Sequence, residues 1–125
     1  MVVRLALMVL RIAVLLNLLT GILFWTGNAD SLVPVHMGLG ILAVLSLWTL
    51  GFTQALTPGG SWGLALVAAV FGIILAASGG AQDQILAGSS HWVIQGTHLL
   101  LGLVAIGLGE WIGRRYRHRS VTLVS

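Results

Sequence analysis

The chain has 125 residues, of which 58% are hydrophobic and 7% are charged. Because about a quarter of the residues of a soluble domain carry charge, this composition excludes an ordinary water-soluble fold and indicates an integral membrane protein. The absence of cysteine excludes disulfide bonds, thiolate haem ligands and iron–sulfur clusters. Four of the six arginines lie between Arg114 and Arg119, so the basic charge is typical of a membrane-flanking segment, and no nucleic-acid partner is expected.

Four apolar runs follow one another along the chain, separated by turn-forming segments rich in Gly, Pro, Asn, Asp and Ser. They predict an all-α fold, an integral membrane four-helix up-and-down bundle in the lipid bilayer, with residues 1–125 as a single transmembrane domain. A cleaved signal peptide is an alternative for the first run, but no clear cleavage site follows it. The predicted helices span about 2–26, 31–55, 62–79 and 89–115, followed by a basic tail at 114–125.

The ends of the helices and their charges predict the orientation of the chain. Asp30 or Ser31 is expected to cap the second helix, with Pro34 in its first turn. Four spans place both termini on one side, and the arginines near both ends predict that this side is cytoplasmic, in a bacterial-type inner (plasma) membrane. We expect Arg11 to snorkel toward the headgroups and Glu110 to pair with Arg114, four residues further along the same helix.

One face of the fourth helix is small or polar, which is costly against lipid and therefore predicts that it faces inward. Shorter stripes of small residues in the first and third helices are explained by close helix packing alone. Asn17 and Thr20 in the first helix are expected to make an interhelical hydrogen bond or to face a cofactor. The stripe of the fourth helix consists of His91, Gln95, His98, Gly102, Ala105 and Gly109, at steps of four, three, four, three and four.

A short pattern, His-x-x-x-Gly-x-x-Ala, occurs in both the second and the fourth helix. It suggests two related helix pairs. In an up-and-down bundle these two helices run the same way at diagonal corners, roughly 14 Å apart when neighbours are ~10 Å apart. That spacing accommodates two imidazoles around a metal in a flat macrocycle, with Gly40 and Gly102 leaving room for the ring.

Paired His-x-x-x-Gly helices resemble those of membrane b-type cytochromes, such as the cytochrome b561 and quinol-linked cytochrome b groups, although only these two helices carry the resemblance. It implies haem b held by two histidines in a four-helix bundle. With both axial positions filled, we expect an electron carrier more than a stand-alone enzyme, and no catalytic residue is assigned. Quinol or a redox partner protein is the expected electron donor.

His36 is the only histidine of its helix and is therefore the first expected ligand. Its partner is His98 or His91, and the shared pattern favours His98. Counting back from Trp48 and Trp111, which are expected at the inner membrane boundary, also favours His98. If His91 is the histidine left over, it lies beside Gln95 near the outer surface, where these residues are expected to bond a haem propionate or meet a quinol.

Other functions remain open on sequence alone. The histidines are also compatible with a small transporter or a haem carrier in which they line a path. A zinc or copper site is a further alternative, with His36, His91 and His98 as the three ligands. The chain is finally compatible with a structural subunit that has no cofactor. Surplus stripes of small residues predict a possible homodimer.

Overall fold

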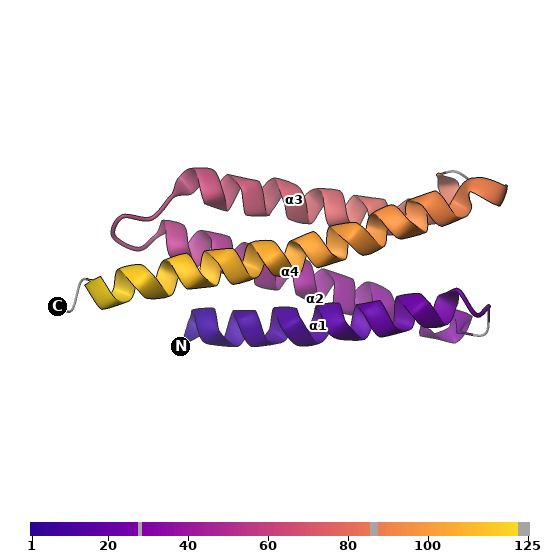
Figure 1. Ribbon diagram of the computed structural model, residues 1–125, viewed down its shortest axis with the longest axis horizontal. Coiled ribbons are helices and arrows are strands. Elements are labelled where there is room, and N and C mark those ends of the chain that lie inside the picture. The colour runs from indigo at the N-terminus through magenta and orange to yellow at the C-terminus, as the bar shows by residue number, and fades with distance from the viewer. Residues whose placement is uncertain (28, 86–87, 123–125) are drawn as a thin grey trace.

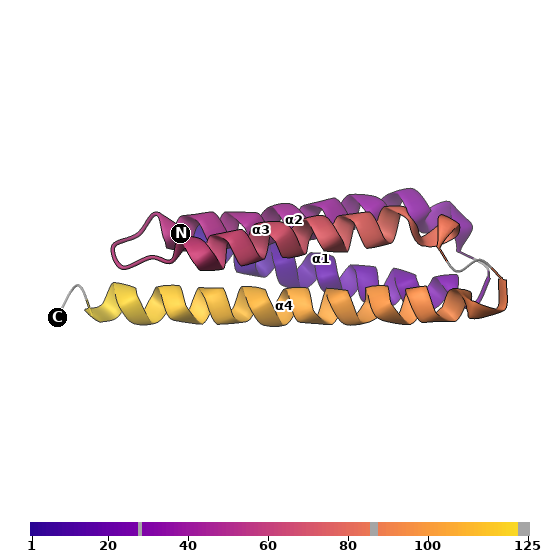
Figure 2. The same ribbon diagram turned by 90° about the horizontal axis from the view of Figure 1, so that it is seen from above.

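The computed structural model describes residues 1–27, 29–85 and 88–122. Its helices run alternately up and down, and both termini lie at the same end of the bundle (Figures 1 and 2). The predicted all-α four-helix bundle is confirmed, and no strand occurs in these residue ranges. The helices are α1 (Val2–Phe24), α2 (Val33–Ala55), α3 (Trp62–Gly80) and α4 (His91–Thr122).

The outward surface of every helix is apolar. Ile12, Ile41, Ile73 and Leu100, one from each helix, each expose half or more of their surface. Apolar surface on all sides of a bundle is stable in lipid, because no water is there to be ordered by it. All four helices are also long and apolar enough to cross a bilayer, so the chain is a multi-pass membrane protein.

The beginning of α2 differs from the prediction. Asp30–Leu32 forms a short 3-10 turn, η1, closed by a hydrogen bond from the Leu32 amide to the Ala29 carbonyl (2.8 Å). The N-cap is therefore Leu32, without a side-chain cap, and the predicted cap at Asp30 or Ser31 is wrong. Pro34 lies in the first turn as predicted, where its missing N–H has no partner to lose.

The last helix is longer than predicted. It begins at His91, after the 3-10 turn Gly88–Ser90 (η3), and continues for 32 residues to Thr122. The basic segment expected as a tail from 114 is thus helical as far as 122, since no glycine or proline follows Gly113; residues 123–125 lie outside the described residues. At ~1.5 Å per residue α4 is roughly 48 Å long, so its C-terminal end extends past the other helices (Figure 1).

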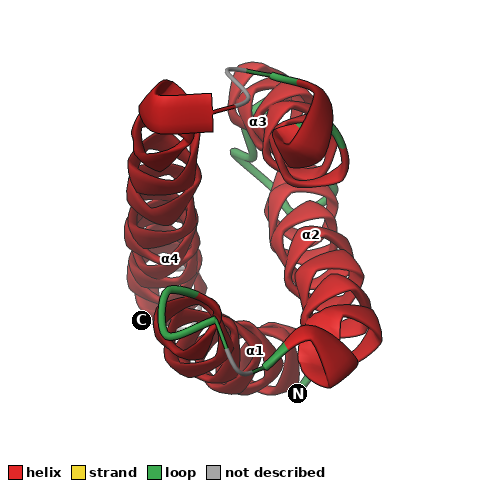
Figure 3. Cartoon of the chain, turned by 90° about the vertical axis from the view of Figure 1, so that its right-hand side faces the viewer, coloured by secondary structure: helices red, strands yellow, loops and turns green. Residues whose placement is uncertain are grey.

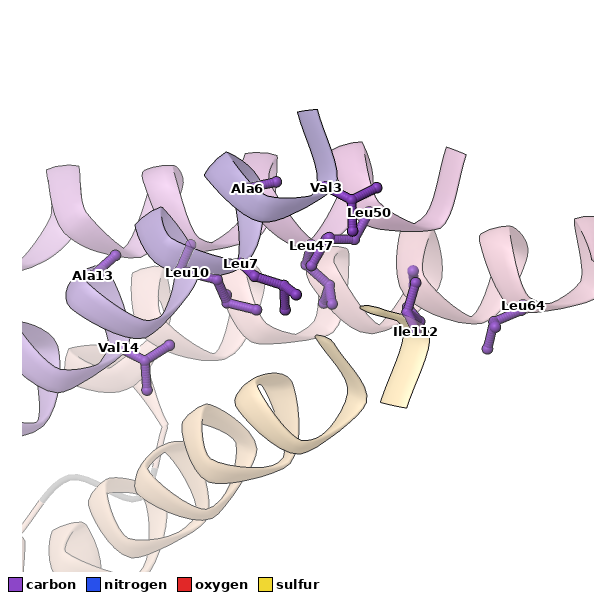
Figure 4. Close-up of a cluster of buried hydrophobic side chains, with 12 residues drawn as sticks. Val3, Ala6, Leu7, Leu10, Ala13, Val14, Leu47, Leu50, Leu64 and Ile112 are labelled. Carbon is purple, nitrogen blue, oxygen red and sulfur yellow. The ribbon is translucent and has the colours of Figure 1, made fainter. Parts of the chain in front are cut away.

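The half of the bundle that holds the termini is tightly packed. Leucines of α1 and α2 interlock there with Ile112 of α4 (Figure 4). A Cβ atom on Gly109 would overlap the side chain of Leu10, and one on Gly113 would overlap Leu7, so these glycines are what let α1 and α4 approach each other. The fully buried members of this cluster include Leu10, Leu47, Leu50 and Ile112.

Trp48 packs against a second buried cluster, formed by Val44, Leu75 and Ala105, and its side chain is turned into the bundle. Its indole Nε1 donates a hydrogen bond to the Ala69 carbonyl (3.2 Å), and its ring occupies the space left by Gly72 of α3. The sequence prediction placed this residue at the membrane boundary because tryptophan is enriched there. Its partner on α3 is far along the chain, and the pairing of α2 with α3 holds it inside.

An ion pair links the first and last helices. The Arg11 Nε donates to Glu110 Oε1 at 2.5 Å, with the two side chains 52% and 25% exposed. The predicted pair of Glu110 with Arg114 is therefore wrong, because Glu110 makes its ion pair with Arg11. That Arg11 also reaches toward the headgroups stays a prediction. A pair at this position lets α1 and α4 keep opposite charges adjacent in a largely apolar surface.

Seen end-on, α2 and α4 lie on opposite sides of the bundle, with α1 and α3 between them (Figure 3). This is the diagonal placement expected from an up-and-down chain. α4 also contacts α2 directly at Ala105, which packs with Val44 of α2 and Leu75 of α3. The expected axis separation of roughly 14 Å is therefore not kept along the whole bundle, because small side chains let the two helices approach.

Candidate functional site

The histidines of α2 and α4 meet inside the bundle. The ring centroids of His36 and His98 lie 6.2 Å apart, with their planes inclined at 48°. His36 is the fourth residue of α2 and His98 the eighth of α4. They reach a common depth because α4 begins further out along the bundle than its neighbours (Figure 1). The structure thus brings together the pair that the repeated pattern favoured.

Each histidine ring is hydrogen-bonded to a hydroxyl group of the helix that precedes its own. Thr20 Oγ1 of α1 lies 2.7 Å from His36 Nδ1. Ser78 Oγ of α3 lies 3.0 Å from His98 Nδ1. The two helix pairs, α1 with α2 and α3 with α4, therefore carry the same arrangement, in agreement with the repeat seen in the sequence.

A glycine follows each of these hydroxyl residues and lies against the same ring. A Cβ atom on Gly21 would come 3.7 Å from His36 Cε1. A Cβ atom on Gly79 would come 2.9 Å from His98 Cε1, closer than such atoms approach in proteins. At Gly79 the lack of a side chain is therefore required for the His98 ring to lie this close to α3.

Asn17 fixes the backbone of α2 beside its histidine. Its side-chain nitrogen donates to the carbonyl oxygen of His36 (2.8 Å), and its side-chain oxygen accepts from the amide of Gly40 (2.9 Å). These two backbone groups are an i, i+4 pair of the helix. Asn17 thus makes the expected interhelical hydrogen bond and ties the depth of His36 to α1. On the same helix, Phe24 contacts the His36 ring edge-on, with centroids 5.2 Å apart.

A cavity of 340 Å³ lies in this half of the bundle, and all four helices line it. The volume falls at the lower end of the range of small-molecule sites, roughly 300–1,000 Å³. A Cβ atom on Gly102 would meet nothing within 4 Å. Among the sequence-predicted residues, those that line the cavity are His36, His98, Gly40, Gly102 and Gln95.

His91 lies apart from this cavity. It is the first residue of α4 and is not among the lining residues. Within residues 1–27, 29–85 and 88–122, no group of three or more His, Cys, Asp or Glu side chains is placed to hold a metal ion. The three histidines of the alternative zinc or copper site are therefore not brought together, since seven residues along a helix separate His91 from His98 by ~10 Å.

Sequence reasoning did not find Gly21 or Ser78, and it left the role of Thr20 open. The missed signal is a second repeat: a hydroxyl residue followed by glycine occurs late in the helix before each histidine helix, as Thr20-Gly21 and as Ser78-Gly79. Their separations from the following histidine, 16 and 20 residues, differ mainly because His36 is the fourth residue of its helix and His98 the eighth. Comparing the two helix pairs residue by residue would have shown it.

The fold and this site together define a multi-pass α-helical membrane protein with two facing imidazoles in a glycine-lined cavity. The chain matches no protein-family model, none of the curated proteins and no solved structure.

Proposed function

We propose that the chain is a haem b-binding electron-transfer protein in which His36 and His98 are the two axial ligands. The observation that carries the proposal is the placement of the two rings. Two imidazoles on opposite sides of one metal ion, each bonded at about 2.0–2.1 Å, have ring centres about 6 Å apart. The centroids of His36 and His98 are 6.2 Å apart.

The surroundings of the rings distinguish a ligand pair from an ordinary aromatic contact. Direct ring contacts span roughly 4.5–7 Å between centroids, so the distance alone fits both. A structural contact needs no free volume, whereas these rings line a 340 Å³ cavity in which Gly102 faces open space. The hydroxyl groups of Thr20 and Ser78 bond the two rings at Nδ1, which leaves Nε2 for a ligand. The cavity therefore favours a guest with volume between the helices.

The residues of the chain have separate tasks in this proposal. His36 and His98 hold the iron, and Gly40 and Gly102 leave room for the macrocycle. Gln95, with Gln82 at the same end of the cavity, supplies amide groups that can donate to carboxylates. When bound, haem would supply reversible one-electron chemistry.

The proposed location follows from charge. Arg4 lies at the end of the bundle that also carries Arg114 and Arg117, and both termini are there. By the excess of arginine this end is cytoplasmic, in a bacterial-type inner membrane. The cavity then lies in the outer half of the bilayer, which suits reduction by a membrane quinol or by an external redox protein.

Absorption spectra of the purified protein test the proposal. The chain is expressed with ample haem precursor, solubilised in detergent, and examined for Soret and α-band absorption with and without dithionite. We expect reducible haem in the wild type and its loss in His36→Ala and in His98→Ala. His91→Ala is the matched control, since this helical histidine lies apart from the cavity, and it should retain the pigment.

Two outcomes contradict the proposal. A colourless wild-type protein with unchanged helicity would remove haem binding and favour transport or a structural role. Loss of haem in His91→Ala with retention in His98→Ala would show that the ligand pair is wrong.

A further inference from the structure

The two hydroxyl groups that contact the histidines also lie within hydrogen-bonding distance of backbone carbonyl oxygens of their own helices. Thr20 Oγ1 donates to the backbone carbonyls of Leu16 (3.0 Å) and Asn17 (3.1 Å). Ser78 Oγ donates to the carbonyl of Leu75 (2.9 Å). A hydroxyl group has one proton and two lone pairs, so toward a further partner each oxygen can only accept.

With the hydroxyl protons donated to these carbonyls, the count favours one tautomer for both histidines. The hydroxyl oxygens then accept, and the ring nitrogens that face them, the Nδ1 atoms of His36 and His98, donate. A neutral imidazole carries a single proton. With that proton on Nδ1, the Nε2 atom of each ring is unprotonated and has its lone pair available.

We propose that Thr20 and Ser78 are positioning residues that hold His36 and His98 in the Nδ1-protonated form, so that the cavity is lined by two imidazoles ready to ligate through Nε2. The opposite tautomer has its proton on the ligating nitrogen and cannot bind a metal without losing it. Gly79, which follows Ser78, lets the His98 ring lie against the helix that carries the acceptor.

The expected effects of these tautomers on a bound metal rest on the proposed haem function. A hydrogen bond at Nδ1 makes the ligating nitrogen a stronger donor, and loss of such a bond typically weakens metal binding about 10- to 100-fold. A weaker donor stabilises ferric iron less, so loss of either hydroxyl should also raise the reduction potential of the bound haem. Neither effect is expected from a side chain that only fills space.

Nitrogen-15 NMR of the histidine-labelled protein in micelles, prepared without haem, tests the tautomers directly. In the wild type at neutral to mildly alkaline pH we expect a protonated Nδ1 and an unprotonated Nε2 for both rings. Thr20→Val should shift His36 toward the other tautomer, and Ser78→Ala should do so for His98. Thr20→Ser, which restores the hydroxyl, should recover the wild-type signature.

The matched control is Thr49→Val. Thr49 Oγ1 donates to the carbonyl of Leu45 four residues earlier (2.8 Å), as Thr20 does to Leu16, but it lies exposed on α2 away from both rings. It should leave both tautomers unchanged. The proposal is overturned by an Nε2-protonated ring in the wild type, or by Thr20→Val and Ser78→Ala spectra identical to the wild type.

A haem titration of the same variants separates the two proposals. If the tautomers respond as expected but no variant or wild type binds haem, the assigned function fails and the positioning role stands. If haem binds with equal affinity and potential in all variants, and the tautomers are unchanged, the positioning role fails while the function stands.

Discussion

His98 lies across the bundle from His36, with 6.2 Å between the ring centroids, although the two residues belong to different helix pairs. Each ring is held by a hydroxyl group of the neighbouring helix, so the distance depends on all four helices. The packed leucine cluster at the other end of the bundle fixes how these helices cross (Figure 4). One half of the bundle, which holds the termini, is therefore tightly packed, and the other half contains a cavity that two imidazoles line.

Filling the cavity should prevent haem binding without unfolding the protein. Gly102→Leu places a large side chain in open space that lines the cavity. Because overpacking a site of fixed shape costs about 1–3 kcal/mol, bound haem should fall about tenfold or more. Gly107→Leu is the control, since this glycine on the same helix also faces open space but does not line the cavity. Haem content per protein and helicity are the measurements; equal haem content in both variants would contradict the proposed site.

Adding a methyl group at Gly79 should displace one ligand. In Gly79→Ala the new Cβ would lie 2.9 Å from His98 Cε1, so the ring must move away from α3 and from Ser78. We expect weaker haem binding and a changed nitrogen-15 spectrum of His98, with His36 unaffected. Gly96→Ala, where the added carbon meets nothing within 4 Å and which does not line the cavity, should behave like the wild type. An unshifted His98 signal in Gly79→Ala would show that the ring has room to spare.

The ion pair between α1 and α4 should be detectable as coupling. Arg11→Met and Glu110→Gln each leave one charge without its partner in an apolar surface, so each should lower the unfolding temperature in detergent. The double variant should be less destabilised than the sum of the two. Arg4→Met paired with Glu110→Gln provides the comparison, because Arg4 is on α1 like Arg11 but is not among the arginines whose charge acts on Glu110, and their effects should add. Additive effects for Arg11 and Glu110 would mean that their ion pair does not contribute to the stability of the folded protein.

Gln54 should be important for the turn between α2 and α3. It is 1% exposed; its Nε2 donates to the Ser61 carbonyl (2.7 Å), and its Oε1 accepts from the Ser61 amide (3.3 Å). Gln54→Leu leaves both backbone groups without this partner and should lower the free energy of unfolding by about 1–3 kcal/mol. Denaturant titration in mixed micelles measures it, with the exposed Thr49→Val as a control. A wild-type midpoint for Gln54→Leu would show that other groups satisfy the turn.

Truncating Leu10 should lower the free energy of unfolding, because Leu10 belongs to the tightly packed half of the bundle. Leu10 is completely buried and fills the space above Gly109, so Leu10→Ala should cost about 2–5 kcal/mol of unfolding free energy. Leu100→Ala, on the lipid-facing side of α4, should cost far less. The same denaturant titration compares them, and equal losses would show that burial against the other helices adds nothing to burial in the detergent.

Helix pattern and helix number could be predicted from the sequence because both depend on residues close together in the chain. Apolar runs of bilayer length, broken at Gly27, at Pro58-Gly59-Gly60 and after Gly79-Gly80, determine four spans whatever their arrangement. The pairing of His36 with His98 was also predicted, because the pattern His-x-x-x-Gly-x-x-Ala marks equivalent positions in two helices.

Only the tertiary structure decided the contacts that depend on helix tilt and on where each helix begins. Glu110 has Arg114 one turn away on its own helix, yet its ion pair is with Arg11, because packing on Gly109 and Gly113 brings α1 alongside. Trp48 turned inward because Gly72 of α3 lies opposite it. Likewise Ser78 is hydrogen-bonded to His98 because α4 begins beyond the end of α3, which places the two residues at the same depth in the bundle. Local sequence patterns determine which segments form helices. Which side chains become neighbours is determined by the packing of segments that are distant in the chain.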